Sequence, residues 1–332
     1  PETFFWFNVF WFTMMASFTI IGLELYPNSL MGPVVGRLLA AVISALWVLS
    51  RIFREFGVRF DFTWLKTSFG FNTYTYLYQI LQWVINYFDR IVMLIALTLA
   101  DIGVYNFATQ CLIALELLMN SLHSTFYPKV VSNIMGQSEK QSTPEINRYY
   151  HGLTAVIMLA VVSGVLALPW AIETFVYKVA YQKSIPYLPF LATIYFFRTM
   201  RLFFTSPYGI LKYTKPLPLV YLLVAGLKIV LMLTLMPFLQ VYGVIAASLV
   251  SAVVEIILLR YSIKNMFRFQ YNFFKIVGAP IALFLLIIIL EPLFGHLYPY
   301  LIHSFYFISC VGLLWWAYRK EIQLINPFQS GK

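Results

Sequence analysis

The sequence predicts an all-α polytopic membrane protein, and three observations lead to this class. Of the 332 residues, 61% are hydrophobic and only 11% are charged, whereas about 25% of the residues of a soluble domain are charged. Apolar stretches of about 20 residues, the length that crosses a bilayer as a helix, recur along the chain. Aromatic residues make up 19% of the chain, and many lie near the ends of these stretches, at the expected level of the lipid headgroups.

About ten stretches are long and apolar enough to span the membrane. They cover residues 3–23, 31–51, 69–98, 102–127, 149–176, 186–211, 217–237, 241–262, 273–293 and 299–318. The connections between them are mostly short and polar or contain proline. The longest, Lys129–Arg148, has no apolar periodicity and is expected to be a surface loop, so no separate soluble domain is predicted.

Basic residues alternate between the two sides of the predicted membrane domain. Most of the 23 Lys and Arg residues lie in alternate connections, near residues 51–66, 129–148, 212–215, 260–275 and 319–332. The connections on the opposite side contain only Lys178 and Lys183. Because cytoplasmic loops carry an excess of Lys and Arg, we expect the first set in the cytoplasm. The net charge of +10 then follows from topology, and no nucleic-acid partner is predicted.

The stretch from Phe69 to Leu99 contains polar residues at helical spacing. They lie three or four positions apart, at Asn72, Thr75, Gln79, Gln82, Asn86 and the adjacent pair Asp89 and Arg90. Residues at this spacing share one face of an α-helix. A charged side chain in hydrocarbon is costly, so this polar stripe is expected to contact protein or a water-filled cavity rather than lipid.

Further charged residues lie within the predicted spans, and the bases outnumber the acids. The bases are Arg37, Arg90, Arg198, Arg201 and Lys228, and the deep acids are Asp89, Glu116 and Glu255. Ionisable residues at such positions normally line a substrate or ion path. An excess of basic groups predicts an anionic ligand, such as a phosphate, a carboxylate or a lipid pyrophosphate.

Structural explanations compete with this interpretation. Arg37 lies near a helix end, where a long side chain can snorkel to the headgroups. Arg198 and Arg201 lie three residues apart on one helix face and either bind an anion together or form ion pairs with Glu116 or Glu255. Glu116 itself is either a proton or sodium acceptor or a hydrogen-bonded structural carboxylate.

For Arg90, the alternative to ligand binding is a closed ion pair with Asp89. Adjacent residues point about 100° apart on a helix, which argues against that pair. Lys228 lies in the middle of an otherwise apolar stretch, so snorkelling does not explain it.

Nothing in the sequence predicts an enzyme. Cys111 and Cys310 both lie in apolar stretches and form neither a disulfide framework nor a metal-ligand pattern. The chain has no glycine-rich phosphate loop and no nucleophile–base arrangement. We therefore expect no catalytic residue, no cofactor and no metal. His123, alone near a helix end, is expected to pack rather than to bind a ligand.

Four segments carry a family resemblance. Asp89–Tyr105 (DRIVMLIALTLADIGVY) is similar to a D-R, apolar run, G-x-Y pattern, and Tyr242–Ser248 (YGVIAAS) resembles a Y-G-x-x-G-A-A run with Ala246 where glycine is common. Phe126–Lys129 and Tyr208–Lys212 fit as well. Together they resemble bacterial polysaccharide flippases of the O-antigen type, in the multidrug/oligosaccharidyl-lipid/polysaccharide exporter superfamily.

The resemblance, which covers roughly residues 51–267, implies an architecture. It is two six-helix lobes that form a V around a central cavity and rock against each other, with about 12 to 14 helices in all. Residues 1–52 are then the last two helices of the first lobe, 53–267 the second lobe, and 268–332 two extra helices with a cytoplasmic tail. Because the chain begins with Pro1 inside an apolar stretch, we expect four helices to precede it.

The resemblance also implies a function. Family members flip undecaprenyl-pyrophosphate-linked oligosaccharides across the bacterial plasma membrane by alternating access, for surface polysaccharides such as O-antigen and lipopolysaccharide. The implied substrate-binding residues are Gln79, Gln82, Asn86, Arg90, Arg198, Arg201 and Lys228, and the implied ion-coupling residues are Asp89 and Glu116. The implied partners are the lipid-linked oligosaccharide, membrane lipids, H⁺ or Na⁺, a polysaccharide polymerase and glycosyltransferases.

Three other functions compete with flipping of a lipid-linked glycan. The first is a cation-coupled exporter of drugs or of a lipid such as lipid II on the same fold. A cationic-drug exporter should place acids and aromatics in its cavity rather than bases. A membrane-embedded glycan polymerase or ligase needs a long outer loop, and the outer connections here are short. A non-transporting scaffold has no need of the polar stripe.

Overall fold

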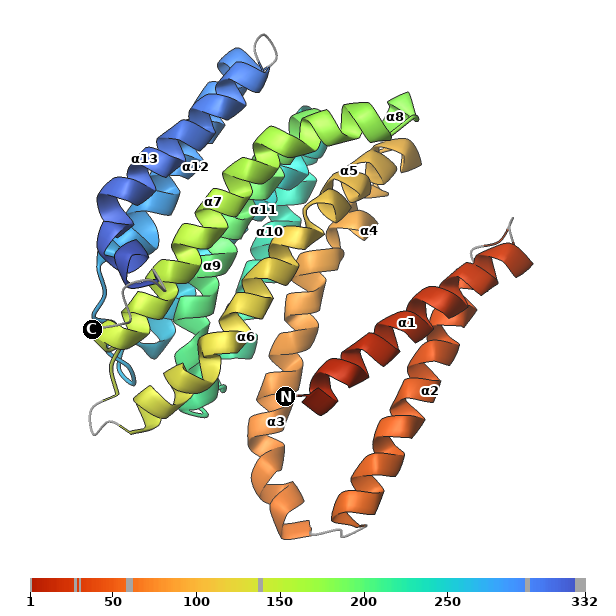
Figure 1. Ribbon diagram of the computed structural model, residues 1–332, viewed down its shortest axis with the longest axis vertical. Coiled ribbons are helices and arrows are strands. Elements are labelled where there is room, and N and C mark those ends of the chain that lie inside the picture. The colour runs from red at the N-terminus through yellow and green to blue at the C-terminus, as the bar shows by residue number, and fades with distance from the viewer. Residues whose placement is uncertain are drawn as a thin grey trace. The chain divides into compact units, whose positions relative to one another are not determined.

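The computed structural model (Figure 1) describes residues 2–26, 29, 31–57, 62–136, 140–295 and 299–325. Nearly all of these residues are helical, and the described backbone contains no β-sheet, only an isolated bridge between Gln141 and Arg268. The chain divides into two compact units, Pro1–Thr67 and Ser68–Lys332, and each is described by itself. The boundaries implied by the family resemblance, after residues 52 and 267, stay a prediction.

The first unit contains two long helices, α1 (Glu2–Leu25) and α2 (Met31–Phe56), which pack against each other. Most of their described large apolar side chains are exposed, as expected for helices whose apolar surface is covered by lipid. Arg37 on α2 is exposed as well, which is compatible with snorkelling to the headgroups.

Glycines bring α1 and α2 together. A Cβ atom on Gly36 would lie 2.2 Å from the carbonyl oxygen of Phe18, and a Cβ atom on Gly32 would lie 2.0 Å from that of Gly22. Both distances are far below van der Waals contact, so only a residue without a side chain fits at these positions. Small residues at the interface allow the same close approach in other pairs of membrane helices.

The second unit contains the remaining helices, of which α3 begins within the last residues of the first unit. In chain order they are α3 (Phe62–Tyr87), α4 (Asp89–Met93), α5 (Leu99–Cys111), α6 (Ile113–Met135), α7 (Pro144–Phe175), α8 (Val179–Gln182), η1 (Ile185–Tyr187), α9 (Leu188–Ile210), α10 (Leu217–Leu239), α11 (Val241–Ile263), η2 (Phe274–Gly278), α12 (Ala279–Leu290), η3 (Glu291–Gly295) and α13 (Pro299–Ile325).

Helix α7 organises the packing of the second unit. It contacts α6, α9 and α13, while α11 packs against α9 and α10, and α12 packs against α9. Figure 1 shows α12 and α13 along one side of α7. The interior contains fully buried apolar side chains from these helices, among them Val161 and Val165 of α7, Phe196 of α9 and Val244 of α11.

The protein is a multi-pass membrane protein. Among the described residues, seven helices are long and apolar enough to cross a bilayer: Met31–Glu55, Leu99–Met135, Pro144–Phe175, Leu217–Leu239, Val241–Ile263, Phe274–Gly295 and Pro299–Arg319. The shorter apolar helix Val9–Leu25 falls in the first predicted span. Helices α3 and α9, also predicted as spans, are not among the seven. Helix α3 carries the polar stripe, and α9 carries Arg198 and Arg201 of the site described below.

The stretch from 69 to 98, predicted as one helix, is broken. Helix α3 ends at Tyr87, Phe88 forms a turn, and α4 covers only Asp89–Met93. A sequence of mostly apolar residues without proline gives no local signal for such a break, so tertiary contacts decide it.

A capping box then starts α5. The side chain of Thr98 accepts a hydrogen bond from the backbone N–H of Asp101, and the Asp101 carboxylate accepts one from the backbone N–H of Thr98. Two backbone donors that the new helix leaves open are satisfied in this way. The predicted helix 102–127 is divided as well, because the chain turns at Leu112 between α5 and α6.

The expectation of a long surface loop at Lys129–Arg148 is wrong at both ends. Helix α6 continues to Met135, with Val130 and Ile134 buried, and α7 begins at Pro144. This part of α6 is helical because it packs against α7, a contact that local periodicity does not reveal.

The remaining connection is partly held by backbone pairing, although residues 137–139 lie outside the described part of the chain. The backbone N–H of Ser142 donates to the carbonyl of Arg268, and that of Arg268 donates to the carbonyl of Lys140, both at 3.0 Å. The Ser142 hydroxyl also accepts a hydrogen bond from the backbone N–H of Gln270 at 2.7 Å. This connection is therefore tied to the segment between α11 and α12.

Candidate substrate cavity

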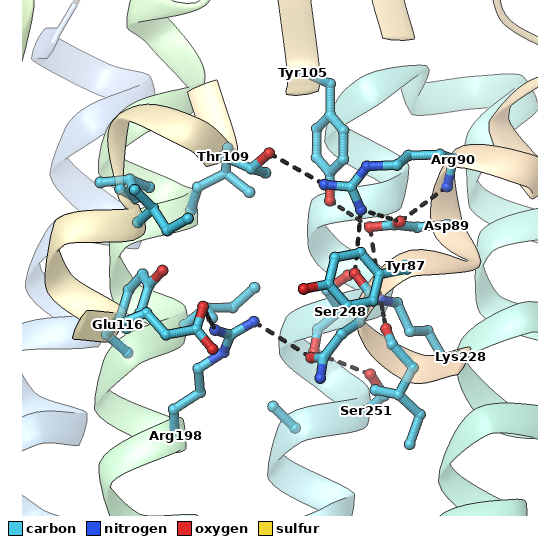
Figure 2. A pocket seen from close by; sticks show the side chains of 18 of the residues that line it. Tyr87, Asp89, Arg90, Tyr105, Thr109, Glu116, Arg198, Lys228, Ser248 and Ser251 are labelled. Atoms are coloured by element: carbon cyan, nitrogen blue, oxygen red, sulfur yellow. Dashed lines mark hydrogen bonds and ion pairs between the residues drawn. The ribbon is translucent and has the colours of Figure 1, made fainter. Parts of the chain in front are cut away.

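A cavity of about 150 Å³ lies within the second unit, where α3, α4, α5, α6, α9, α10 and α11 meet (Figure 2). Its polar and charged lining residues are Asn86, Tyr87, Asp89, Arg90, Tyr105, Thr109, Gln110, Glu116, Tyr195, Arg198, Arg201, Lys228, Ser248, Ser251 and Glu255. Figure 2 shows Arg90 and Asp89 on one side of the cavity and Arg198 with Glu116 on the other.

The broken helices expose backbone carbonyls at the level of the cavity. The Lys228 ammonium on α10 donates to the carbonyl of Ile85, and Nη1 of Arg90 donates to the carbonyl of Asn86 at 3.2 Å. Carbonyls at the end of a helix have no partner within the helix, and in a membrane they must find one in the protein. Cationic side chains therefore satisfy the end of α3.

Asp89 accepts from several donors at once and is only 4% exposed. One carboxylate oxygen accepts from the backbone N–H of Arg90 at 2.9 Å and from Nη1 of Arg90 at 3.0 Å. The other accepts from the Tyr105 hydroxyl at 2.7 Å and lies 3.9 Å from Nζ of Lys228. This buried carboxylate joins α4, α5 and α10.

The expectation that Asp89 and Arg90 point apart is therefore wrong. On one continuous helix they would point apart, whereas Asp89 follows the turn at Phe88 and is the first residue of α4. The long Arg90 side chain folds back over that turn, so its Nη1 reaches both the end of α3 and the adjacent carboxylate.

Arg90 also holds α4 against α5. Its Nε donates to Oδ1 of Asn106 at 3.1 Å, and its Nη2 donates to Oγ1 of Thr109 at 3.3 Å. The guanidinium lies 5.4 Å from the ring centre of Tyr87, a cation–π distance. Because a guanidinium has five N–H groups, these contacts and those to Asn86 and Asp89 use most of its donors.

Arg198 and Arg201 of α9 each have a different acid as partner. Nη1 of Arg198 lies 2.8 Å from Oε2 of Glu116 on α6, and Nη1 of Arg201 lies 3.8 Å from Oε1 of Glu255 on α11. The ion pairs considered as the alternative are thus formed in this conformation. Both arginines nevertheless line the cavity.

The two ion pairs differ in exposure. The Glu116 side chain is 40% exposed and that of Arg198 20%, against 6% for Glu255 and 12% for Arg201. An exposed pair contributes roughly 0.2–1 kcal/mol, whereas breaking a buried pair by removing one partner costs about 3–5 kcal/mol. The Arg198–Glu116 pair is therefore the easier of the two to open.

The lining has one more base than acid. Arg90, Arg198, Arg201 and Lys228 stand against Asp89, Glu116 and Glu255. The buried hydroxyl of Ser248 has no hydrogen-bond partner among the described residues. A polar cavity with an excess of cations and an unpartnered hydroxyl suits a hydrogen-bonding anion.

The rest of the polar stripe does not reach this cavity. Asn86, Asp89 and Arg90 line it, whereas Gln79 is exposed, Gln82 is half-buried and neither lines it. Gln79 and Gln82 share α3 with Asn86 but lie about two turns and one turn before it, so they fall short of the level at which the cavity lies.

Thr75 lines a second cavity, of about 180 Å³, together with His123. The His123 ring packs against Phe126 and Tyr127, and its Nε2 lies 3.3 Å from the Tyr150 hydroxyl. His123 therefore packs within the bundle. Among the described residues, no three His, Cys, Asp or Glu side chains are grouped as metal ligands.

Sequence reasoning did not select several polar residues of the cavity. Tyr105 is the last residue of the D-R…G-x-Y segment and donates a hydrogen bond to Asp89. The motif could therefore have identified Tyr105 as a site residue. Ser248 and Ser251 lie three residues apart on α11, and Glu255, already named as a deep acid, lies four residues further on. This spacing places them on one face and could have identified the two serines.

Fold and site together define a helical membrane protein with a charged cavity between broken helices. No family model and no curated protein matches the chain. Among solved structures, the chain is similar to "Lipid II flippase MurJ, inward closed conformation", with a TM-score of 0.60 and 17% sequence identity. The likeness covers 95% of this chain and 68% of that chain. The chain therefore has the fold of a lipid flippase.

Proposed function

We propose that this chain belongs to a transporter that flips a lipid-linked oligosaccharide, carried on undecaprenyl pyrophosphate, across the bacterial plasma membrane. The cargo serves the synthesis of a cell-surface polysaccharide such as O-antigen, and transport proceeds by alternating access. The protein is a transporter and not an enzyme. The observation that carries this proposal is the cavity with excess positive charge inside a bundle of flippase fold.

The chemistry of the cavity supports an anionic headgroup. A guanidinium is planar and presents paired donors that match phosphate oxygens, and Arg90, Arg198 and Arg201 all line the cavity. Lys228 adds a buried positive charge. The acids beside these bases keep the cavity from holding an anion permanently, since a carrier must also release its cargo.

Gln79, Gln82 and Asn86 are proposed to contact the sugars. Gln79 and Gln82 lie on α3, outside the cavity. Asn86 lines the cavity, next to the end of α3. Amide side chains both donate and accept hydrogen bonds, as recognition of sugar hydroxyls requires.

Proton or sodium coupling is proposed at Glu116 rather than at Asp89. Asp89 is buried and already surrounded by donors, whereas Glu116 is partly exposed to the cavity. Membrane lipids, a polysaccharide polymerase and glycosyltransferases are the further proposed partners.

A cation-coupled exporter of drugs or other lipids on the same fold is the second candidate. The exposed carboxylate of Glu116 is the observation that favours it, because a cationic cargo needs such a group. The solved structure to which the chain is similar is a lipid II flippase, which supports a lipid-linked cargo. Loss of the gene should abolish surface glycan in the first case and raise sensitivity to cationic drugs in the second.

Arg90 provides the test of an anionic cargo. In the full-length protein, Arg90→Ala is expected to abolish glycan export at unchanged abundance in the membrane, and Arg90→Lys to retain part of it, because an ammonium lacks the paired donors. The measurement is surface glycan beside quantified membrane protein, in a strain that lacks its own copy.

Arg260→Ala is the matched control, because Arg260 is exposed on α11 outside the cavity and contacts the Tyr271 ring. Normal export by Arg90→Ala at normal abundance would remove Arg90 from the site. Low abundance of Arg90→Ala itself would instead assign Arg90 to folding.

A further inference from the structure

The four bases of the cavity are not equally available to a ligand. Arg90 and Lys228 share the buried Asp89 and also hold the end of α3. Arg201 faces the buried Glu255. Only Arg198 pairs with an acid that is partly exposed, since 40% of the Glu116 side chain is exposed, and both residues line the cavity.

Arg198 also retains donors for a ligand. Its hydrogen bonds within the described residues are one from Nη1 to Glu116 and one from Nη2 to Oδ1 of Asn86 at 3.4 Å. A guanidinium has five N–H groups, so further donors are open. The ring of Tyr195, 5.1 Å away, supports the guanidinium and keeps it in place when one partner leaves.

A phosphate group and the Glu116 carboxylate compete for the same face of Arg198. Both accept two parallel N–H bonds from a guanidinium, and a phosphate has more acceptor oxygens and more charge. An exposed ion pair is weak, so a phosphate can displace the carboxylate. Asn86 would then still hold Arg198, and through its carbonyl it also contacts Arg90.

We propose that Arg198 and Glu116 form an exchange site. The phosphate of the cargo displaces the Glu116 carboxylate from Arg198 when it binds, and the carboxylate takes Arg198 back when the cargo leaves. Glu116 is then a built-in competitor that weakens binding and promotes release. This inference rests on the proposed function, because it names the group at which the anionic headgroup is held.

The exchange site predicts that removal of an acid strengthens binding. The probe is farnesyl pyrophosphate, a short isoprenyl pyrophosphate, with farnesol as the control that lacks the charge. Its Kd is measured with purified full-length protein in lipid nanodiscs. Because an exposed pair is weak, Glu116→Gln is expected to bind the probe roughly two- to fivefold more tightly than the wild type. Arg198→Gln is expected to bind it at least tenfold more weakly.

Glu173→Gln is the matched control for the loss of one negative charge. Glu173 is exposed near the end of α7, where it accepts a hydrogen bond from Tyr300, and it does not line the cavity. Its Kd is expected to equal that of the wild type. Glu116→Asp retains the charge on a shorter side chain and is expected to give an intermediate Kd, which provides the same test should Glu116→Gln not be purified.

Two failures can be told apart. A wild-type protein that binds farnesyl pyrophosphate no better than farnesol would overturn the proposed function and the exchange site together. A wild type that prefers the pyrophosphate, with Glu116→Gln equal to it or weaker, would overturn the exchange site alone.

Discussion

Single charged residues divide the cavity into a buried set and an open set. Asp89, Lys228 and Glu255 are almost fully buried, whereas Glu116 is open. Buried charges are costly unless they are paired and hydrogen-bonded, and Asp89 and Lys228 lie beside each other with hydrogen-bond partners of their own. These two residues must therefore stay together for the bundle to fold. The open set is free to change partners during transport.

Asp89→Asn tests the buried set. We expect it to lower the free energy of unfolding by about 3–5 kcal/mol, because Arg90 and Lys228 lose their shared buried carboxylate. Glu116→Gln, at the exposed pair, is expected to lower it by less than about 1 kcal/mol. Both values are measured by chemical unfolding of the purified protein in detergent, and equal losses would contradict this division.

A double-mutant cycle isolates the contact between Asp89 and Lys228. Lys228→Met is expected to recover part of the stability that Asp89→Asn loses, because it removes a buried cation that has lost its partner. Additive losses from the two changes would show that the 3.9 Å contact contributes nothing.

Helices and their breaks position these residues. The end of α3, the single turn of α4 and the capped start of α5 bring carbonyls and side chains to one level of the bundle. A continuous helix would satisfy its own carbonyls and leave none for Lys228 and Arg90. The same elements therefore build the cavity and retain the buried cations.

Close helix contact in the first unit allows a test at the level of elements. Gly36→Ala is expected to destabilise the α1–α2 pair by about 1–3 kcal/mol, because the added Cβ would lie 2.2 Å from a backbone oxygen. Gly226→Ala on α10 is the control, since nothing lies within 4 Å of its Cβ position. It should be neutral or stabilising, as alanine favours helix.

The measurement is the loss of helical circular dichroism on titration with sodium dodecyl sulfate. A Gly36→Ala protein as stable as the wild type would mean that α1 and α2 do not depend on this contact.

The distribution of basic residues sets the orientation of the whole molecule. Within the second unit, the end of α7 and the start of α13 lie at one end, and the end of α6 and the start of α7 lie at the opposite end (Figure 1). Lys129, Lys140 and Arg148 belong to the second of these ends. Cytoplasmic loops carry the positive excess, so that end is predicted to face the cytoplasm.

Single cysteines test this orientation. With Cys111 and Cys310 replaced by alanine, a cysteine at Tyr177, which is 96% exposed, is expected to react with a membrane-impermeant maleimide on intact cells. A cysteine at Met266, also exposed, should react only after the inner membrane is opened. Reaction of the Met266 position on intact cells would reverse the topology.

Several features follow from the sequence alone. Membrane class, the approximate spans and the presence of an internal charged site depend on hydropathy and helical spacing, which are local properties of the chain. They led to Arg90, Arg198, Arg201, Lys228 and Glu116 without a structure, and all five line one cavity.

Only the tertiary structure decided which charges meet and where the helices break. Asp89 contacts Tyr105 and Lys228, 16 and 139 residues away in sequence, because α5 and α10 pack beside α4. The extension of α6 through Ile134 depends in the same way on its packing against α7. In a membrane, buried polar groups take whichever partners the packed helices bring near, and spacing along one helix does not contain that information.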